Sequence, residues 1–445
     1  MTVFQSWGRI PVVRQDRFFP TWRNSLSIDN RDSLLLPYGR GRSYGDSCLN
    51  DSQTICVTSR LNHFIHFDPE QGILRCESGV GLDEILQLVV PQGWFLAVTP
   101  GTKYVTVGGA IANDVHGKNH HLAGTFGCHV TAFELLRTTG ERLRCSATEN
   151  AAMFRATIGG LGLTGLITWA EIRLKKITTP YIDSETIRFD NLAEFFVLSD
   201  ESDQHWEYTV AWIDCLAQGA HLGRGLFMRG RHSEQPVSSS GQMTNRRLSM
   251  PVNAPGFLLN QYTIRLFNEI YYRKNRQKRM VSRAYYDPFF YPLDSIDNWN
   301  RMYGRRGFYQ YQCLVPLSDG EMVIHRLLET IAASGMGSFL SVLKKFGDIA
   351  SPGMLSFPRA GITLALDFPN YGTKLLALFE KLDEQVMQAK GAVYPAKDAR
   401  MSDKAFQHYF PQWRDFSQYR DPGMSSSFWR RVTGESITNK QAMGQ

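Results

Sequence analysis

The sequence predicts an α+β fold, and three features favour this class over a regularly alternating α/β sheet. Short apolar segments with the two-residue alternation of strands are separated by glycine turns, the helical segments among them are short, and no regular βαβ order appears. The length of 445 residues allows two or three domains with buried cores. With 43% hydrophobic and 20% charged residues, the chain has the composition of an ordinary globular protein.

The first 178 residues carry most of the predicted strands. Each strand has alternating apolar residues bounded by turn residues, and together they cover 55–58, 64–67, 73–77, 130–137, 142–145 and 166–175. Apolar residues at helical spacing predict a helix over 82–90, with Asp83 and Glu84 near its positive N-terminal end. A second helix is expected over 151–158, with Asn150 as its N-cap.

Beyond this first region, the predicted elements are longer and richer in aromatic residues. Strands are expected over 208–214 and 308–315, and amphipathic helices over 320–334 and 372–390. Residues 233–253 are polar and rich in Ser, Gly and Pro, which predicts a mobile loop.

A basic cluster covers residues 273–283 and is flanked by Tyr271, Tyr272, Tyr285 and Tyr286. Two interpretations stay open for it. One is a solvated helix face. The other is a surface that settles on anionic lipid headgroups, where each Lys or Arg contributes roughly 1 kcal/mol.

Charge and cysteine usage limit the classes of partner. A formal charge of +7 and a pI near 9.0 favour anionic ligands or an acidic membrane surface. No arginine-rich run interleaved with aromatics suggests nucleic-acid binding, so none is expected. The seven cysteines are dispersed without a CxxC pair, which predicts reduced thiols in a cytosolic protein. We expect no signal peptide and no membrane-spanning segment, so any membrane contact is expected to be peripheral.

Two glycine-rich segments differ in what they can bind. In the segment 37–46, three closely spaced glycines let backbone N–H groups converge on a pyrophosphate, and Arg40, Arg42 and Ser43 can add donors. A GxGxxG pattern occurs at 160–165, but a predicted helix precedes it and a strand follows it. Because the dinucleotide fingerprint requires the opposite order, we reject a Rossmann site there.

The segment from Pro100 to His121 is the most informative. Over 106–111, small residues such as Gly108 and Gly109 clear space where a helix N-terminus can press against a flat ligand. Polar groups then crowd beside the same surface, from His116 through Lys118 and Asn119 to His121. His116 and His120 are four apart, but the intervening Gly117 disfavours a helix and no nearby Cys, Asp or Glu completes an evident ligand set. No metal site is therefore expected.

These segments resemble the PCMH-type FAD-binding domain of the vanillyl-alcohol-oxidase superfamily and, within it, the decaprenylphosphoryl-β-D-ribose oxidases. The resemblance rests on motifs that occur in order along nearly the whole chain: GRSYGD at 41–46, the Pro100–His121 segment, YQYQCLVP at 309–316, SFLSVLKKFG at 338–347, LSFP at 355–358, DFP at 367–369 and YPAKDAR at 394–400.

The resemblance implies a two-part FAD-binding domain, built from residues 1–178 and 392–445, and an antiparallel-sheet α+β substrate domain over 179–391. It implies FAD contacts at Gly39, Arg40, Gly41, Arg42, Ser43, Tyr44, Gly101, Thr102, Gly108, Gly109, His116, Gly117, Asn119, Ile167 and Tyr394. Covalent relatives attach FAD through a histidine in the first glycine loop. Ser43 and Tyr44 stand there in this chain, so non-covalent FAD is expected.

The resemblance also implies the reacting groups. Lys397 matches the family's active-site lysine, and it and His116 are the expected catalytic residues, with the identity of the base left open. The expected substrate contacts are Gln310, Gln312, Trp212, Lys344, Tyr44 and Lys118. Simpler interpretations remain: a surface lysine for Lys397, a solvated sheet face for the glutamines, core packing for Trp212 and solvation for Lys344.

The implied reaction is FAD-dependent oxidation of a secondary hydroxyl, at C2′ of a polyprenylphosphoryl pentose, to the 2-keto sugar. A short-chain dehydrogenase/reductase partner would complete an epimerisation, in the cytoplasm or at the inner membrane. The alternatives are an FAD-dependent aldonolactone or alditol oxidase acting on a free sugar, and a flavin- or lipid-binding protein without turnover. Two positions depart from the family: Thr363 stands in place of Asn, and Ala365 in place of the mycobacterial Cys.

Overall fold

The structure is a computed structural model that describes residues 4–28, 33–235, 248–275 and 277–436. Its N-terminal part is built on two sheets. The larger has the order β4-β5-β9-β7-β8 with β6 pairing β9, and the smaller is a parallel sheet of order β1-β3-β2. The strands are β1 (Asp16–Phe18), β2 (Leu35–Tyr38), β3 (Thr54–Val57), β4 (Phe64–Asp68), β5 (Ile73–Glu77), β6 (Trp94–Leu96), β7 (Val130–Leu136), β8 (Arg142–Ser146) and β9 (Leu166–Lys176).

Short helices pack on these sheets: α1 (Leu82–Val89), α2 (Val107–Ala112), α3 (His120–Ala123) and α4 (Ala151–Thr157). α1 buries its leucine and isoleucine stripe, and the Glu84 carboxylate accepts the Gly81 N–H at 2.7 Å to close its N-terminus. In α2, Thr106 is the N-cap, with its hydroxyl oxygen accepting the Gly109 N–H at 3.1 Å.

The second part is an eight-stranded sheet in which every neighbouring pair is antiparallel, in the order β14-β10-β12-β11-β17-β18-β16-β19. Its strands are β10 (Tyr181–Phe189), β11 (Tyr208–Ile213), β12 (Gly225–His232), β14 (Arg279–Tyr285), β16 (Phe308–Val315), β17 (Ser341–Phe346), β18 (Gly361–Pro369) and β19 (Ala392–Val393). A short parallel pair, β13 (Leu248–Ser249) with β15 (Ile296–Asp297), lies outside it.

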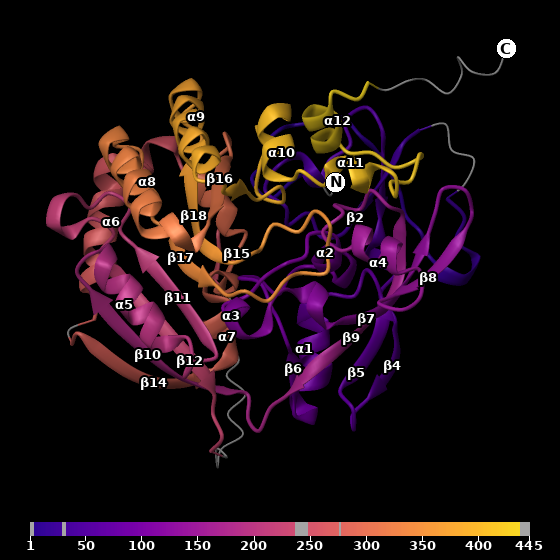
Figure 1. The fold of residues 1–445 in the computed structure, drawn as a ribbon, viewed down its shortest axis with the longest axis horizontal. Helices are drawn as coiled ribbons and strands as arrows, with labels where there is room; N and C mark the ends of the chain where they lie inside the picture. The colour runs from indigo at the N-terminus through magenta and orange to yellow at the C-terminus, as the bar shows by residue number, and fades with distance from the viewer. Residues whose placement is uncertain (1–3, 29–32, 236–247, 276, 437–445) are drawn as a thin grey trace.

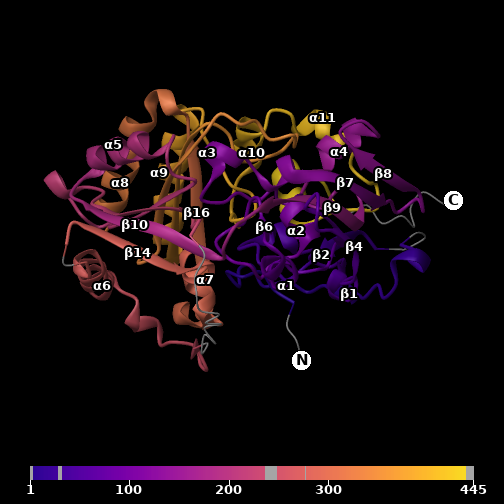
Figure 2. The same ribbon diagram turned by 90° about the horizontal axis from the view of Figure 1, so that it is seen from below.

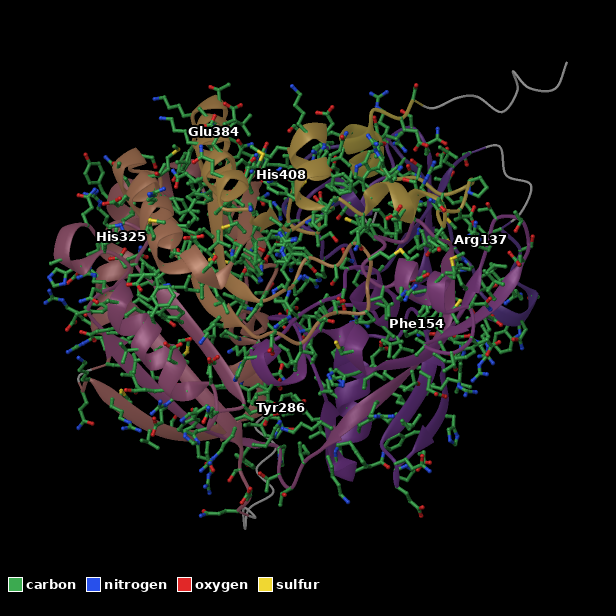
Figure 3. All side chains as sticks on the ribbon, viewed as in Figure 1. Arg137, Phe154, Tyr286, His325, Glu384 and His408 are labelled. Atoms are coloured by element: carbon green, nitrogen blue, oxygen red, sulfur yellow. The ribbon has the colours of Figure 1, made fainter. Side chains whose placement is uncertain are left out.

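Helices cover the two faces of this sheet unequally. α5 (Leu192–Ser202), α8 (Gly320–Ser334) and α9 (Thr373–Gln388) lie on one face, and Figure 2 shows α6 (Gln261–Arg273) on the opposite side. Strand alternation explains the division, since Phe227 of β12 joins the core under α5 while its neighbour Leu226 packs with Tyr272 of α6. In Figure 3, His325 of α8 and Glu384 of α9 are on the outer surface of their helices.

The C-terminal helices α10 (Asp403–Tyr409), α11 (Trp413–Ser417) and α12 (Ser427–Thr433) lie against the N-terminal part, drawn in yellow beside β2 in Figure 1. Leu35 of β2 exchanges backbone hydrogen bonds with Gly423 and Ser425, at 2.8 and 2.9 Å. The two large parts also share a core. The ring of Tyr286 in α7 (Tyr286–Phe290) packs on the ring of Phe95 in β6, with centroids 5.2 Å apart, and Figure 3 labels Tyr286 between the two parts.

The α+β class is confirmed, and the predicted strands and helices occur with ends shifted by at most two residues. Asn150 is not the side-chain cap of α4: it has a left-handed backbone (φ 49°) and its amide donates instead to the carbonyl of Arg144, at 2.8 Å. The basic cluster is not one helix face, because α6 ends at Arg273 and β14 begins at Arg279. Most of the predicted loop at 233–253 lies outside the described residues. The predicted domain boundaries stay a prediction.

Candidate active site

A cavity of about 380 Å³ lies where the two parts and the C-terminal segment meet. Its walls come from the loop after β2, the segment 99–118, strands β11, β16, β17 and β18, and the residues around Tyr394. All of the residues predicted to contact cofactor or substrate line this cavity, except Asn119. The Asn119 amide donates to the carbonyl of Ala97 at 2.8 Å and so fastens the loop behind the cavity.

The loop 39–46 and the segment 394–398 hold each other in place. A Cβ on Gly45 would lie 1.7 Å from the carbonyl oxygen of Asp398, so only glycine permits this close approach. Arg431 of α12 then joins the two segments, donating to Asp46 at 2.7 Å and to Asp398 at 3.0 Å. This packing explains why two motifs about 350 residues apart belong to one site, and it places Lys397 Nζ 3.9 Å from the ring centroid of Tyr44.

The two arginines of the first glycine loop are already engaged with the protein. Arg40 donates to Asp83 at 2.5 Å and to Glu84 at 2.7 Å. The Arg42 guanidinium lies 4.0 Å from the ring of Trp7, and its Nε donates to the carbonyl of Tyr104 at 3.2 Å. Both therefore shape the loop through contacts with the protein, and the donors that the loop offers to the cavity come largely from its backbone.

The cavity wall fits a large polar and aromatic cofactor. A Cβ on Gly101 would meet no protein atom within 4 Å, so the space beside it is open. Within the described residues, three buried polar atoms of the lining have no hydrogen-bond partner: Ser47 Oγ, Ser78 Oγ and His116 Nδ1. Buried polar atoms of folded proteins nearly always have partners, so these atoms indicate a ligand with hydrogen-bonding groups.

A chain of hydrogen bonds orients His116. The Thr363 hydroxyl donates to the carbonyl of Cys313 at 2.9 Å, so its oxygen is an acceptor for the Gln312 amide N–H at 3.3 Å. The same amide nitrogen donates to His116 Nε2 at 3.1 Å. Burial, followed by the charges of Lys344, His120 and Lys397, holds the pKa of His116 well below its usual value. The imidazole is therefore neutral, with its proton on Nδ1, a buried atom that has no hydrogen-bond partner within the described residues.

Three lysines concentrate positive charge in the same cavity. Burial, and then the neighbouring Lys397, lowers the pKa of Lys344 to about 8. Burial and Lys344 lower the pKa of Lys118 to about 7. Burial also lowers the pKa of Lys397, which Asp367 partly offsets, and burial raises the pKa of Asp367. An anion that enters the cavity would relieve this mutual repulsion.

The positions of these side chains do not fit solvation of the lysines and glutamines, whereas core packing of Trp212 does fit. Lys397 and Lys344 line the cavity, and Lys344 Nζ donates to the carbonyl of Gly117 at 3.4 Å. Trp212 is packed, with its indole N–H donating to the carbonyl of Phe339 at 2.9 Å, and it is also one of the residues that line the cavity. Gln310 lines the cavity and donates to Asp367.

Sequence reasoning did not select four residues of this region as site residues: Ser47, Ser78, Thr363 and Asp367. Thr363 and Asp367 could have been predicted, because strand alternation on β18 places them on the same face as Ala365. No pattern distinguishes Ser47 and Ser78 from other serines. The described residues contain no group of three His, Cys, Asp or Glu side chains that could hold a zinc ion. The His120 ring stacks on the ring of Phe346, with centroids 4.3 Å apart.

Known proteins are similar to this chain over most of its length. A family model described as an FAD binding domain matches residues 28–146. The chain is 35% identical over 395 residues to decaprenylphosphoryl-beta-D-ribose oxidase from Mycolicibacterium smegmatis, which covers 87% of this chain and 85% of that protein. It is 32% identical over 356 residues to an uncharacterized protein in the mprA 5′ region of Streptomyces coelicolor, which covers 77% of this chain and 95% of that protein. D-arabinono-1,4-lactone oxidase from Yarrowia lipolytica is 25% identical over 212 residues, which cover 46% of this chain and 38% of that protein.

Proposed function

The chain belongs to the decaprenylphosphoryl-β-D-ribose oxidase family of FAD-dependent oxidoreductases, and on this basis we propose that it oxidises a secondary hydroxyl of a pentose carried on a polyprenyl phosphate. The hydroxyl is at C2′ and the product is the 2-keto sugar, the first half of an epimerisation that a short-chain dehydrogenase/reductase completes. The observation that carries the proposal is the group of Lys118, Lys344 and Lys397 in a cavity that also has an apolar wall.

We assign the cofactor to the part of the cavity formed by the two glycine segments. The backbone of 39–44, 101–102, 108–109 and 117, together with Ile167 and Tyr394, would hold FAD, and Ser47 and Ser78 would satisfy their hydroxyls on it. Bound FAD supplies the hydride acceptor. The first glycine loop offers no histidine for a covalent link, which favours non-covalent binding.

Lys397 is our candidate for the base. Burial lowers the pKa of its amine, so a useful fraction is neutral near physiological pH and can take the hydroxyl proton. His116 has the wrong tautomer for this role, because its Nε2 accepts from Gln312 and its Nδ1 carries a proton. We therefore propose that His116 donates a hydrogen bond from Nδ1 and orients the bound groups.

The remaining groups would recognise the lipid-linked phosphate. A phosphate between Lys118 and Lys344 would favour the charged form of both amines, each of which burial now disfavours. Trp212, Met228 and Tyr271 give the cavity an apolar side for the first isoprene units. A free sugar would leave both the cations and this apolar side without partners.

Product analysis tests the proposal. Purified holoenzyme is incubated with a polyprenylphosphoryl ribose and an artificial electron acceptor, and the product is analysed by mass spectrometry after reduction with borodeuteride. We expect a product two mass units lighter than the substrate before reduction and one unit heavier than the substrate after it, with the deuterium at C2′. Deuterium at another carbon would contradict the assigned position. Oxidation of D-arabinono-1,4-lactone in place of the lipid-linked sugar would favour the alternative of a free-sugar oxidase. The similarity to the lactone oxidase from Yarrowia lipolytica is the reason to test this compound.

A further inference from the structure

Helix α6 has two apolar faces, and only one of them is packed. Ile264, Asn268 and Tyr272 are buried against the sheet. Tyr262, Leu266 and Ile270, also four residues apart, are 73%, 61% and 62% exposed. Residues spaced by four share one helix face, and the two series lie on nearly opposite sides of α6. The second apolar stripe therefore has no partner among the described residues.

The exposed stripe belongs to a stretch of the chain in which exposed apolar residues are concentrated. Of the sixteen large hydrophobic side chains exposed in the described residues, nine fall between 248 and 281. They are Leu248, Val252, Leu258, Tyr262, Leu266, Phe267, Ile270, Met280 and Val281. Single exposed apolar residues are ordinary, but such a concentration is typical of an interaction site. We call the exposed face of α6, with Tyr262, Leu266, Phe267 and Ile270, the docking surface.

Positive charge surrounds this apolar stripe. The segment 248–281 contains six basic residues and one acidic residue, Glu269. Lys274 has its amine over the ring of Tyr271, while Lys278 pairs with Glu194 of α5 and Arg279 pairs with Glu185 of β10. Beside it, a surface hollow that includes Val252 is lined by Arg9, Arg301 and Arg305. Apolar residues flanked by an excess of cations are complementary to an anionic bilayer surface.

α6 also forms part of the cavity wall. Tyr271 lines the cavity and packs on Trp212, with ring centroids 4.7 Å apart. The exposed stripe is on the far side of the same helix, so about one helix diameter, roughly 10 Å, separates it from the cavity. Figure 2 shows α6 on the side of the sheet away from α5 and α8, where these helices do not cover it.

We propose that the docking surface binds the face of an anionic phospholipid bilayer, with Tyr262, Leu266 and Ile270 among the acyl chains and Lys274 and Lys278 at the headgroups. None of the helices in the described part of the chain has the length and apolar character needed to cross a bilayer, so contact through α6 is interfacial. A second copy of the chain fits less well, because a two-fold contact would bring like charges together. Delivery of a lipid-linked sugar through this surface rests on the proposed function, whereas membrane binding itself does not.

Vesicle flotation of the resting holoenzyme tests the binding. Wild type is expected to float with vesicles of phosphatidylglycerol and phosphatidylcholine, and Leu266→Gln/Ile270→Gln is expected to lose at least tenfold in partition coefficient. The matched control is Val197→Gln/Met322→Gln, which alters two equally accessible apolar side chains on α5 and α8 (57% and 48% exposed) and is expected to float like wild type. Equal flotation of wild type and the α6 variant would overturn the proposal, as would a wild type that binds no vesicles.

The charge contribution has its own variant. Lys274→Gln/Lys278→Gln is expected to weaken binding to the anionic vesicles by about fivefold for each lysine, and to leave binding to pure phosphatidylcholine unchanged. Sedimentation equilibrium without lipid tests whether a second copy of the chain covers α6 instead. A wild-type dimer that binds no vesicles, and that Leu266→Gln/Ile270→Gln dissociates, would overturn the proposal in favour of self-association. All variants are expected to oxidise a short-chain, water-soluble analogue of the lipid-linked sugar at the same rate. If no variant oxidises it, the proposed function fails, while the vesicle-binding result is unaffected.

Discussion

At the scale of single residues, a threonine outside the expected flavin contacts orients an imidazole that is among them. The Thr363 hydroxyl fixes which end of the Gln312 amide faces His116. Because Gln312 donates to Nε2, the proton of His116 is held on Nδ1. Thr363 is thus a positioning residue.

Removal of this hydroxyl should lower turnover without unfolding the protein. In Thr363→Val, which has nearly the same shape, Gln312 loses its acceptor and is free to flip. A lost hydrogen bond of about 1–1.5 kcal/mol corresponds to roughly a tenfold fall in kcat. Thr363→Ser keeps the hydroxyl and should retain most of the activity. Equal kinetics of the Val and Ser variants would contradict the positioning role.

Lys397 carries the largest expected effect. Lys397→Met keeps the length and apolar stem of the side chain but removes the base, and we expect a fall in kcat of about 10²–10⁴ with FAD occupancy unchanged. Since the neutral amine is the reactive form, kcat of the wild type should rise with pH through the lowered pKa of Lys397, and the variant should lack this rise. Near-normal turnover of a variant with full FAD occupancy would exclude the assignment.

Lys344 should oppose stability while it serves binding. Burial lowers its pKa to about 8 from 10.5, so between these values the unfolded chain binds more protons than the folded one, and the free energy of unfolding of the wild type rises with pH. Below pH 8 the FAD-free Lys344→Met variant should be more stable by up to about 3 kcal/mol, an advantage that shrinks toward pH 10. Its KM for the lipid-linked substrate should rise. A variant that is less stable than the wild type at pH 7 would refute this account.

At the scale of elements, the glycine segments can be tested apart from the fold. Gly101→Leu places a side chain where no protein atom lies within 4 Å, so the melting temperature of the FAD-free protein should not change. The side chain would, however, occupy the cavity, and we expect FAD affinity to fall at least tenfold. Gly256→Leu, which also meets no atom within 4 Å, is the control with normal FAD affinity. Unaltered FAD binding in Gly101→Leu would place the cofactor elsewhere.

Elements with a strong local pattern were predictable, and those decided by distant contacts were not. The alternation over 308–315 identified β16 and put Gln310 and Gln312 on the face that lines the cavity. Asn150 was misjudged because its amide is used to close the turn after β8. The His116 tautomer depends on a partner 196 residues away, and no local pattern encodes such a contact.

At the scale of the whole molecule, the site exists only because three parts of the chain meet. The N-terminal sheets supply the glycine segments, the eight-stranded sheet supplies Gln312 and Lys344, and the C-terminal segment supplies Lys397. Arg431 holds the last of these against the first through Asp46 and Asp398. The buried lysines and the exposed face of α6 are the two features on which we base the proposals of an anionic, lipid-linked substrate and of a membrane-binding surface.

Flavin absorbance under anaerobic conditions tests the central claim most directly. The oxidised holoenzyme is mixed in the absence of oxygen with a polyprenylphosphoryl ribose, with free ribose or with D-arabinono-1,4-lactone, and bleaching is followed by stopped flow. We expect rapid bleaching by the lipid-linked pentose and at least a hundredfold slower bleaching by either free compound. Rapid bleaching by a free sugar or lactone, with none by the lipid-linked pentose, would contradict the claim.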